Sequence, residues 1–247
     1  MKKTNYRLLC ALVPLFLAPC APAQKPPSPE LRAFQEAAGD GSIVFRGKQA
    51  IGYDRPANGN PYWRSAEFAS GEIIFEGKRY YDILINIDAF EGTALVRLPS
   101  DPVTIALAPS TVESILLPGH RFIGVGPDSK ALPEGFYEVF GDGPESVYKH
   151  VTKTLQISIG TNVNGKLIGY EDENYNPELI HYYSISTTYY FRDSEGRISR
   201  LNGKNSLLSK FPDRRKEIRR ALDNAGLQRS GVSFDAWCRG VLQAAAQ

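Results

Sequence analysis

The side chains best suited to catalysis or metal binding are few and widely spaced. The three histidines, His120, His150 and His181, lie 30 and 31 residues apart. None belongs to an HxH or HExxH pattern and there is no CxxC, whereas zinc sites draw on ligands at short, regular spacing. His150 and His181 fall in adjacent predicted strands, where a cross-strand pair would bring two ligands together. The spacing itself predicts no metal site and no cofactor.

Hydrolase chemistry has equally little support, because GxSxG does not occur in the sequence. A glycosidase needs only two carboxylates beside an aromatic platform. Acidic residues that could supply such a pair are Asp82, Asp88, Glu91, Asp142, Glu145, Glu171, Asp172 and Glu173. Since nothing selects two of them, the sequence predicts no catalytic residue and a protein that is not an enzyme.

Clustered aromatic residues indicate binding instead. A predicted strand at residues 181–192 places Tyr182, Tyr190 and Arg192 on one face, among serine and threonine hydroxyls. Exposed tyrosine beside arginine can stack on a sugar or contact a protein, although cross-strand aromatic pairs inside a sheet use the same residues. The other face of the strand should belong to the core, with Tyr183, Ile185, Tyr189 and Phe191.

Tyr62 and Trp63 are the second aromatic candidate for a binding site. The alternative is that they form a plug over the end of the sheet.

The segment 171–176 is a candidate of a different kind, because it resembles the start of a calcium loop. Pro177 stands where an EF-hand needs glycine, so a solvated acidic loop is the better interpretation.

The first 23 residues have the layout of a secretory signal peptide. Lys2, Lys3 and Arg7 precede an apolar run at residues 8–18, and residues 21–23 supply a small-residue cleavage site. The run is too short to span a bilayer. We therefore expect export to the periplasm or association with the outer membrane.

Cys20 offers an alternative N-terminus. The residues Leu17-Ala18-Pro19-Cys20 approximate a lipobox, which would make a lipoprotein anchored through Cys20. Pro19 weighs against lipidation, because a small residue is usual at that position. Cleavage after Ala23 would instead leave Cys238 as the last cysteine, in an apolar helical pattern that predicts a buried and unreactive thiol.

The net charge gives no support for nucleic acid as a partner. The chain carries +2, but its first 23 residues hold three of the 29 Lys and Arg and none of the 27 Asp and Glu, so the remainder carries −1. The basic residues gather instead near one predicted helix: Lys210, Arg214, Arg215, Lys216, Arg219 and Arg220. A solvated helix face is the usual meaning of such a run. The alternative is an anionic lipid surface bound through Arg214, Arg215, Arg219 and Arg220.

Period-two alternation from residue 42 to about 201 predicts an antiparallel sheet. In its clearest strand, residues 79–88, every second residue from Tyr81 to Ile87 should face the core. Further strands are expected at residues 72–76, 93–98, 103–108, 121–125, 135–140, 147–159, 181–192 and 197–201. Lys149 and Lys153 break the apolar phase of the longest one, so part of it should bend or leave the sheet.

Two helices should close the chain, one with Pro212 in its first turn and Gly226 at its end, the other capped by Ser233. The predicted fold is mainly β, an antiparallel meander or rolled sheet, with a C-terminal α-helical hairpin. The expected organisation is a signal peptide (1–23), a proline-rich spacer with a short helix (24–41), an antiparallel β domain (42–204) and a helical hairpin packed on it (205–247).

Residues 62–86 resemble the opening of uncharacterised exported proteins common in Bacteroidetes. Those chains share a GxIxxxGKxYxDIxLxYD-style meander, a GFYEVL-like strand, here residues 135–140, and a terminal basic helix followed by a second. The tyrosine that ends their strand motif is replaced here by Ile87. The resemblance covers roughly residues 60–245 and implies a β-rich envelope protein, with no catalytic residues to transfer.

Together these observations favour an exported, non-catalytic binding or structural module with an envelope protein or a glycan as its partner. The alternative is a glycan-binding or glycan-hydrolysing protein that uses surface aromatics and a carboxylate pair.

Overall fold

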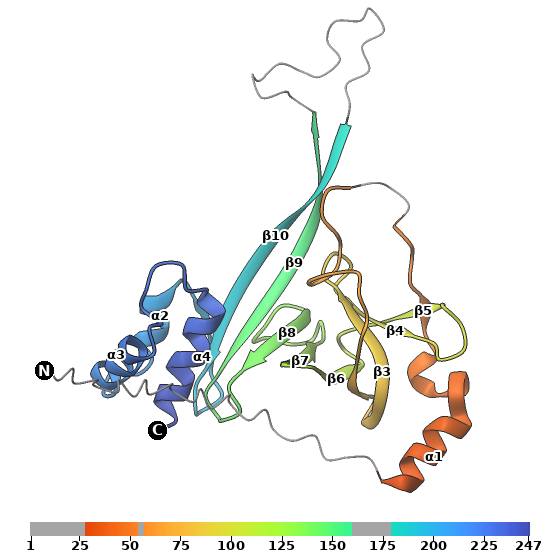
Figure 1. Cartoon of the computed structure of the whole chain (residues 1–247), viewed down its shortest axis with the longest axis horizontal. Coiled ribbons are helices and arrows are strands. Elements are labelled where there is room, and N and C mark those ends of the chain that lie inside the picture. The colour runs from red at the N-terminus through yellow and green to blue at the C-terminus, as the bar shows by residue number, and fades with distance from the viewer. Residues whose placement is uncertain (1–27, 54–56, 160–178) are drawn as a thin grey trace, which may run out of the picture.

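The computed structural model describes residues 28–53, 57–159 and 179–247 (Figure 1). Its eleven strands form one antiparallel sheet in the order β1-β5-β4-β3-β2-β6-β7-β8-β9-β10-β11. Strands β2 to β5 and strands β6 to β11 are two meanders, and the pairing of β2 with β6 joins them. The predicted fold class, mainly antiparallel β with C-terminal helices, is confirmed.

The strands span Lys48–Gln49 (β1), Ala69–Phe75 (β2), Lys78–Asp88 (β3), Thr93–Arg97 (β4), Thr104–Leu107 (β5), Val112–Leu117 (β6), His120–Val125 (β7), Gly135–Phe140 (β8), Ser146–Ile159 (β9), Leu179–Arg192 (β10) and Ile198–Leu201 (β11). The helices span Pro29–Ala38 (α1), Lys204–Leu208 (α2), Arg215–Asn224 (α3) and Phe234–Ala245 (α4). Two short 3-10 turns, Gly39–Gly41 and Ile43–Phe45, follow α1.

A bulge in β3 corrects the predicted alternation of that strand. Between the pairs Gly71↔Ile83 and Ile73↔Tyr80, β3 has one residue more than β2. Asp82 in this segment has a positive φ of 56°, and an extra residue of this kind reverses the side-chain phase. As a result Tyr80 is buried and Tyr81 only half-buried, the reverse of the sequence prediction.

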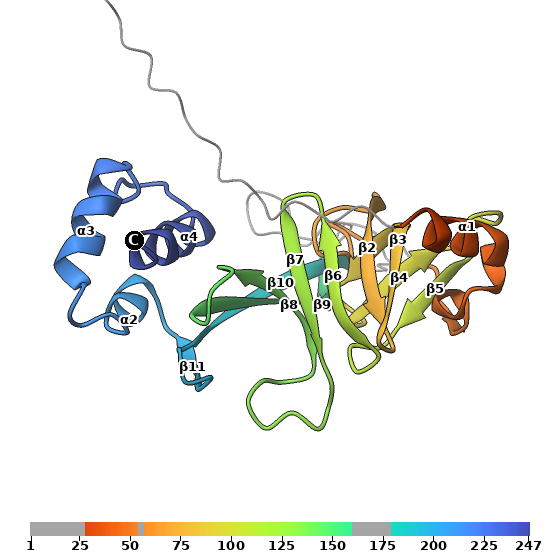
Figure 2. The same cartoon turned by 90° about the horizontal axis from the view of Figure 1, so that it is seen from below.

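Buried apolar side chains form separate clusters along the sheet. One lies on β2 to β8 with Val44 and Phe45, and a second joins the strand ends of β8 to β11 to helices α2, α3 and α4. A third lies around Tyr137 and Tyr148 on the other face of β8 and β9. Figure 2 shows the consequence for the overall shape, with α1 at one end of the sheet and the three C-terminal helices at the other.

The C-terminal helices α3 and α4 agree with the sequence prediction, except that α3 begins later than predicted. Residues 212–214 form turns, and α3 begins at Arg215, three residues after Pro212. The Ser233 hydroxyl accepts a hydrogen bond from the Ala236 N–H, as an N-cap should. In α4 the spacing of Trp237, Cys238 and Val241 turns one face into the second core. The helix is thereby fixed beside β8 and β9.

Candidate functional site

An open cavity of about 440 Å³ lies between α4 and the face of β7 to β10. Its size is typical of a small-molecule site. The residues that line it are Trp63, Arg64, His120, Glu138, Lys149, Val151, Ile185, Thr187, Ser233, Asp235, Ala236 and Arg239. Strand register explains the sheet side of this set, because Glu138 pairs with Lys149 and Lys149 pairs with Tyr189, all on one face.

Glu138 is the most deeply buried charged group of the cavity, with 2% of its side chain exposed. Its Oε1 lies 2.6 Å from His120 Nδ1 and accepts a hydrogen bond of 2.9 Å from Arg239 Nη2. Its Oε2 accepts no hydrogen bond from the described residues, and the Lys149 Nζ is 3.6 Å away. A buried carboxylate needs such cations, since burying an unpaired charge is strongly unfavourable.

His120 joins Glu138 to the mouth of the cavity. Its Nε2 lies 2.9 Å from Arg64 Nη1. Because a guanidinium only donates hydrogen bonds, Nε2 acts as the acceptor and the ring proton sits on Nδ1, where it is donated to Glu138. The imidazole is thus held with one nitrogen toward the buried acid and the other toward Arg64.

Asp235 is the second carboxylate of the cavity, in the first turn of α4. Its Oδ2 lies 2.5 Å from Lys149 Nζ, and its Oδ1 accepts a hydrogen bond of 2.6 Å from the Tyr189 hydroxyl. Burial, together with this hydrogen bond, raises the pKa of Tyr189. Lys149 therefore links the two acids, and Tyr189 remains a neutral donor.

The helix supplies Arg239 four residues after Asp235, on the same side of α4. Its guanidinium lies 4.1 Å from the centre of the Phe140 ring while it pairs with Glu138. Stacking on an aromatic ring and pairing with a carboxylate together fix the orientation of arginine.

A loop before β2 places Trp63 and Arg64 at the cavity. The buried Lys153 amine donates to Asn60 O at 2.8 Å and to its side-chain oxygen at 3.2 Å, and burial lowers the pKa of Lys153. The Trp63 N–H donates to Ile87 O at 2.8 Å. With the loop held in this way, the Trp63 ring centre is 4.8 Å from that of His120, and the Arg64 guanidinium is 4.9 Å from the Trp63 ring.

The charges of the cavity do not balance. Arg64, Lys149 and Arg239 are cations, against the two carboxylates Glu138 and Asp235, and the imidazole of His120 is satisfied as a neutral ring. The α4 N-terminus adds partial positive charge at the same place. The cavity therefore favours a ligand with negative charge.

Among the predicted binding residues, the structure places Trp63 in this cavity and Tyr62 beside it in the same loop. The other three lie elsewhere. Tyr182 is exposed, whereas Tyr190 and Arg192 are half-buried. Tyr190 lies eight residues after Tyr182 on β10, which separates the two by roughly 26 Å at 3.3 Å per residue. Tyr190 packs on Tyr137, with ring centres 6.0 Å apart.

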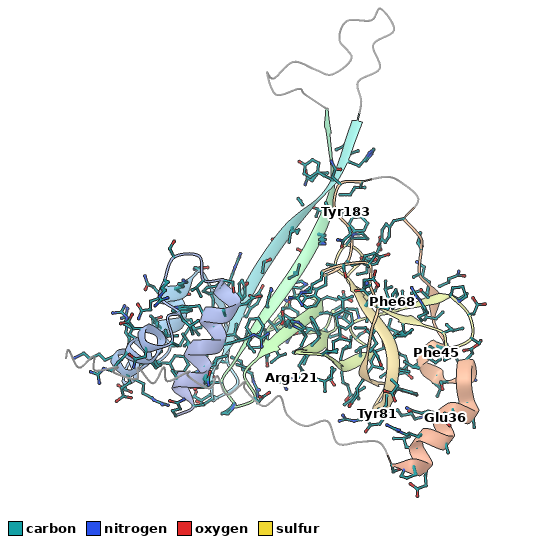
Figure 3. All side chains as sticks on the ribbon, viewed as in Figure 1. Glu36, Phe45, Phe68, Tyr81, Arg121 and Tyr183 are labelled. Carbon is teal, nitrogen blue, oxygen red and sulfur yellow. The ribbon has the colours of Figure 1, made fainter. Side chains whose placement is uncertain are left out.

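The prediction that Ile185 belongs to the core is wrong. Its side chain is 64% exposed on the rim of the cavity, where β9 and β10 extend beyond the rest of the sheet (Figure 1). On the same face, Tyr189 and Phe191 pack against the helices. Figure 3 shows Tyr183 farther along this ribbon, away from the helices.

The predicted basic patch is divided in the structure. Arg214 donates to the carbonyl oxygens of Ala244 and Ala245 at the end of α4, a favourable position for a cation. Arg215 is half-buried, whereas Arg219 and Arg220 are exposed. An anionic lipid surface therefore stays a prediction that rests on the exposed members.

The register also separates the two histidines considered for a cross-strand pair. His150 lies opposite Thr188, and His181 lies opposite Ile157. Cys20, the signal peptide and the acidic segment 171–176 lie outside the described residues.

Sequence reasoning missed Glu138, Asp235 and Arg239 as site residues. A signal for Glu138 exists, because it is the one charged residue in the apolar strand Gly135–Phe140. The sequence predicts from Lys149 and Lys153 that part of β9 bends or leaves the sheet, but β9 pairs with β10 at every residue from Ser146 to Ile159. Both lysines point inward and contact polar partners. A charged residue at a position that the strand pattern assigns to the core is therefore the sequence feature that could have identified these site residues.

Cys238 has the predicted buried position, with no exposed surface. Burial and the neighbouring Asp235 raise the pKa of its thiol to about 12. Because the thiolate is the reactive form, this environment makes the cysteine unreactive.

A second cleft, of about 260 Å³, lies near Tyr53, Phe90 and Tyr183. The acid beside it, Asp88, accepts hydrogen bonds from the Tyr53 hydroxyl and from the backbone N–H groups of Phe90 and Glu91. These donors already satisfy Asp88, so this cleft offers less to a ligand than the cavity at Glu138.

His150 should make stability depend on pH. Its ring stacks on Tyr137 at 4.5 Å, and burial lowers its pKa below the ordinary 6.5. Below about pH 6.5 the unfolded chain takes up a proton that the folded chain refuses, so the free energy of unfolding should fall as the pH drops, by at most about tenfold in the equilibrium constant per pH unit. Urea unfolding of the wild type and of His150→Gln between pH 8 and 5 measures the effect. If the free energy of unfolding of His150→Gln falls with pH as steeply as that of the wild type, the prediction is contradicted.

Comparison with known proteins gives no relative, since no family model, no curated protein and no solved structure matches the chain. Within residues 28–53, 57–159 and 179–247, no helix is long and apolar enough to cross a membrane. The same residues contain no group of three or more His, Cys, Asp or Glu side chains placed to hold a metal ion. Fold and site together define an antiparallel β-sheet protein with a charged cavity bordered by a helix.

Proposed function

We propose that this chain is an exported, non-catalytic binding protein that holds a small anionic molecule in the cavity between α4 and the sheet. The observation that supports this best is the convergence of Arg64, Lys149 and Arg239 on one concave site with only two carboxylates. Charge-assisted hydrogen bonds to such cations are the strongest polar contacts available to a ligand.

The arrangement of the two acids favours binding over catalysis. Glu138 is held by His120 and Arg239, and Asp235 is held by Lys149 and Tyr189. Both carboxylates thus act as acceptors within the protein, and their partners fix the cations around the cavity. This is how a rigid binding site is built.

A glycan-hydrolysing protein is the second candidate, since two carboxylates and Trp63 border one concave site. If the protein hydrolyses glycans, the purified protein should release nitrophenol from 4-nitrophenyl glycosides. The binding proposal expects no release above the rate of a Glu138→Gln variant.

The proposal is tested by calorimetric titration with D-glucuronate, glucose 6-phosphate, cyclohexanecarboxylate and sulfate at low ionic strength. We expect binding of at least one of these anions, and about tenfold weaker binding by Arg64→Gln, which removes one charge-assisted hydrogen bond. Arg64 is exposed, so its loss should leave the fold intact.

Arg200→Gln is the matched control, because Arg200 is also exposed but lies on β11, outside the cavity. This variant should bind like the wild type. Absence of binding by all four anions, or equal weakening in both arginine variants, would overturn the proposal.

A further inference from the structure

One buried acceptor of the cavity has no hydrogen bond to any of the described residues. Glu138 Oε2 has less than 1 Å² of exposed surface, and the Lys149 Nζ, 3.6 Å away, pairs with it by charge without a hydrogen bond. Its carboxylate is 2% exposed and borders the cavity. Buried polar atoms normally have partners, so an unpartnered one beside an open cavity indicates a place for a donor from a ligand.

The surrounding charges restrict the kind of donor. An ammonium group would be attracted to Glu138 but repelled by Arg64, Lys149 and Arg239 around it. A hydroxyl group donates to a carboxylate without adding positive charge. The same cations meanwhile attract an acidic group at a short distance from that hydroxyl.

We propose that the ligand is a hydroxylated acid, such as a sugar acid, whose hydroxyl donates to Glu138 Oε2 while its acidic group binds the cavity arginines. This inference rests on the proposed function and names the ligand class for that site. His120 Nε2 lies at the same cavity, where its one lone pair accepts from the exposed Arg64. Trp63 supplies an apolar surface on which a ring-shaped ligand can pack.

Three probes of similar size separate the two chemical requirements. D-glucuronate has both hydroxyls and a carboxylate, cyclohexanecarboxylate has only the carboxylate, and D-glucose has only hydroxyls. Calorimetric titration of the wild-type protein should give at least tenfold tighter binding of D-glucuronate than of cyclohexanecarboxylate. D-glucose should bind more weakly than either carboxylate.

Glu138→Gln tests the assigned acceptor, because its amide can still accept from Arg239 but presents an N–H in place of Oε2. In this variant the affinity for D-glucuronate should fall to that for cyclohexanecarboxylate, whereas the affinity for cyclohexanecarboxylate should not fall. Equal binding of both carboxylates by the wild-type protein would overturn the inference and leave the anionic proposal standing. Binding of none of the three probes, or of D-glucose alone, would overturn the inference, and it would overturn the anionic proposal as well if glucose 6-phosphate and sulfate also fail to bind. The wild-type comparison decides the inference even if Glu138→Gln fails to fold.

Discussion

Replacing Glu138 by alanine should lower the free energy of unfolding by about 3–5 kcal/mol, because it removes one partner from a buried ion-pair network. His120, Lys149 and Arg239 all lie within 3.6 Å of its carboxylate oxygens. Lys149 would keep Asp235 as a partner, but Arg239 and the His120 Nδ1–H would lose theirs. Since the total free energy of unfolding of a domain is about 5–15 kcal/mol, this loss should be a large part of it.

Urea unfolding followed by circular dichroism measures this loss, with Glu134→Ala as the matched control. Glu134 is exposed immediately before β8, so its truncation should change stability by less than about 0.5 kcal/mol. Glu138→Gln should lie between the two, since its amide oxygen still accepts from Arg239. A loss below about 1 kcal/mol for Glu138→Ala would mean that the network is solvated rather than buried.

Local alternation predicted most of the sheet. Strand β8 and the long pair β9 and β10 were predicted within two residues of the observed bounds, because each presents a continuous apolar or period-two pattern. Strand β6 and helix α2 were missed. Val112–Leu117 follows a proline-rich stretch that obscures the alternation, and five-residue Lys204–Leu208 is too short for helical periodicity to show.

Phase errors arose where the chain departs from ideal geometry. The bulge at Asp82 moves Tyr80 into the core. The residue pattern around Asp82 does not predict this extra residue in β3. Ile185 has the correct phase but lies where β9 and β10 extend past their neighbours, and it is exposed there among the described residues. Both outcomes depend on how distant segments meet, which a single strand cannot encode.

The site was harder to predict than the fold, because its members come from six separate parts of the chain. From the sequence, His120 is considered only as a metal ligand and Trp63 only as a binding residue or a plug, so nothing connects the two. Glu138 and Lys149 become neighbours only through the register of β8 with β9. Asp235 and Arg239 join them only after α4 packs through Trp237 and Cys238 into the second core.

Replacing Trp237 by alanine should therefore affect both stability and the site. The indole is 2% exposed in α4, stacks against Phe234 with ring centres 5.9 Å apart, and has the Lys204 amine 5.9 Å from its ring centre. Truncation of a buried tryptophan leaves a cavity and lowers the free energy of unfolding by about 3–5 kcal/mol. Trp237→Phe, which keeps an aromatic ring, should lose less.

Gln243→Ala is the control in the same helix, because Gln243 is exposed and alanine favours helix, so stability should change by less than about 0.5 kcal/mol. Urea unfolding followed by far-ultraviolet circular dichroism compares the three variants without relying on tryptophan fluorescence. Because α4 contributes Asp235 and Arg239, Trp237→Ala should also weaken binding of any anion that the wild type holds. Full stability in Trp237→Ala would show that α4 is not packed on the sheet through this core, and the cavity would then lack its helical wall.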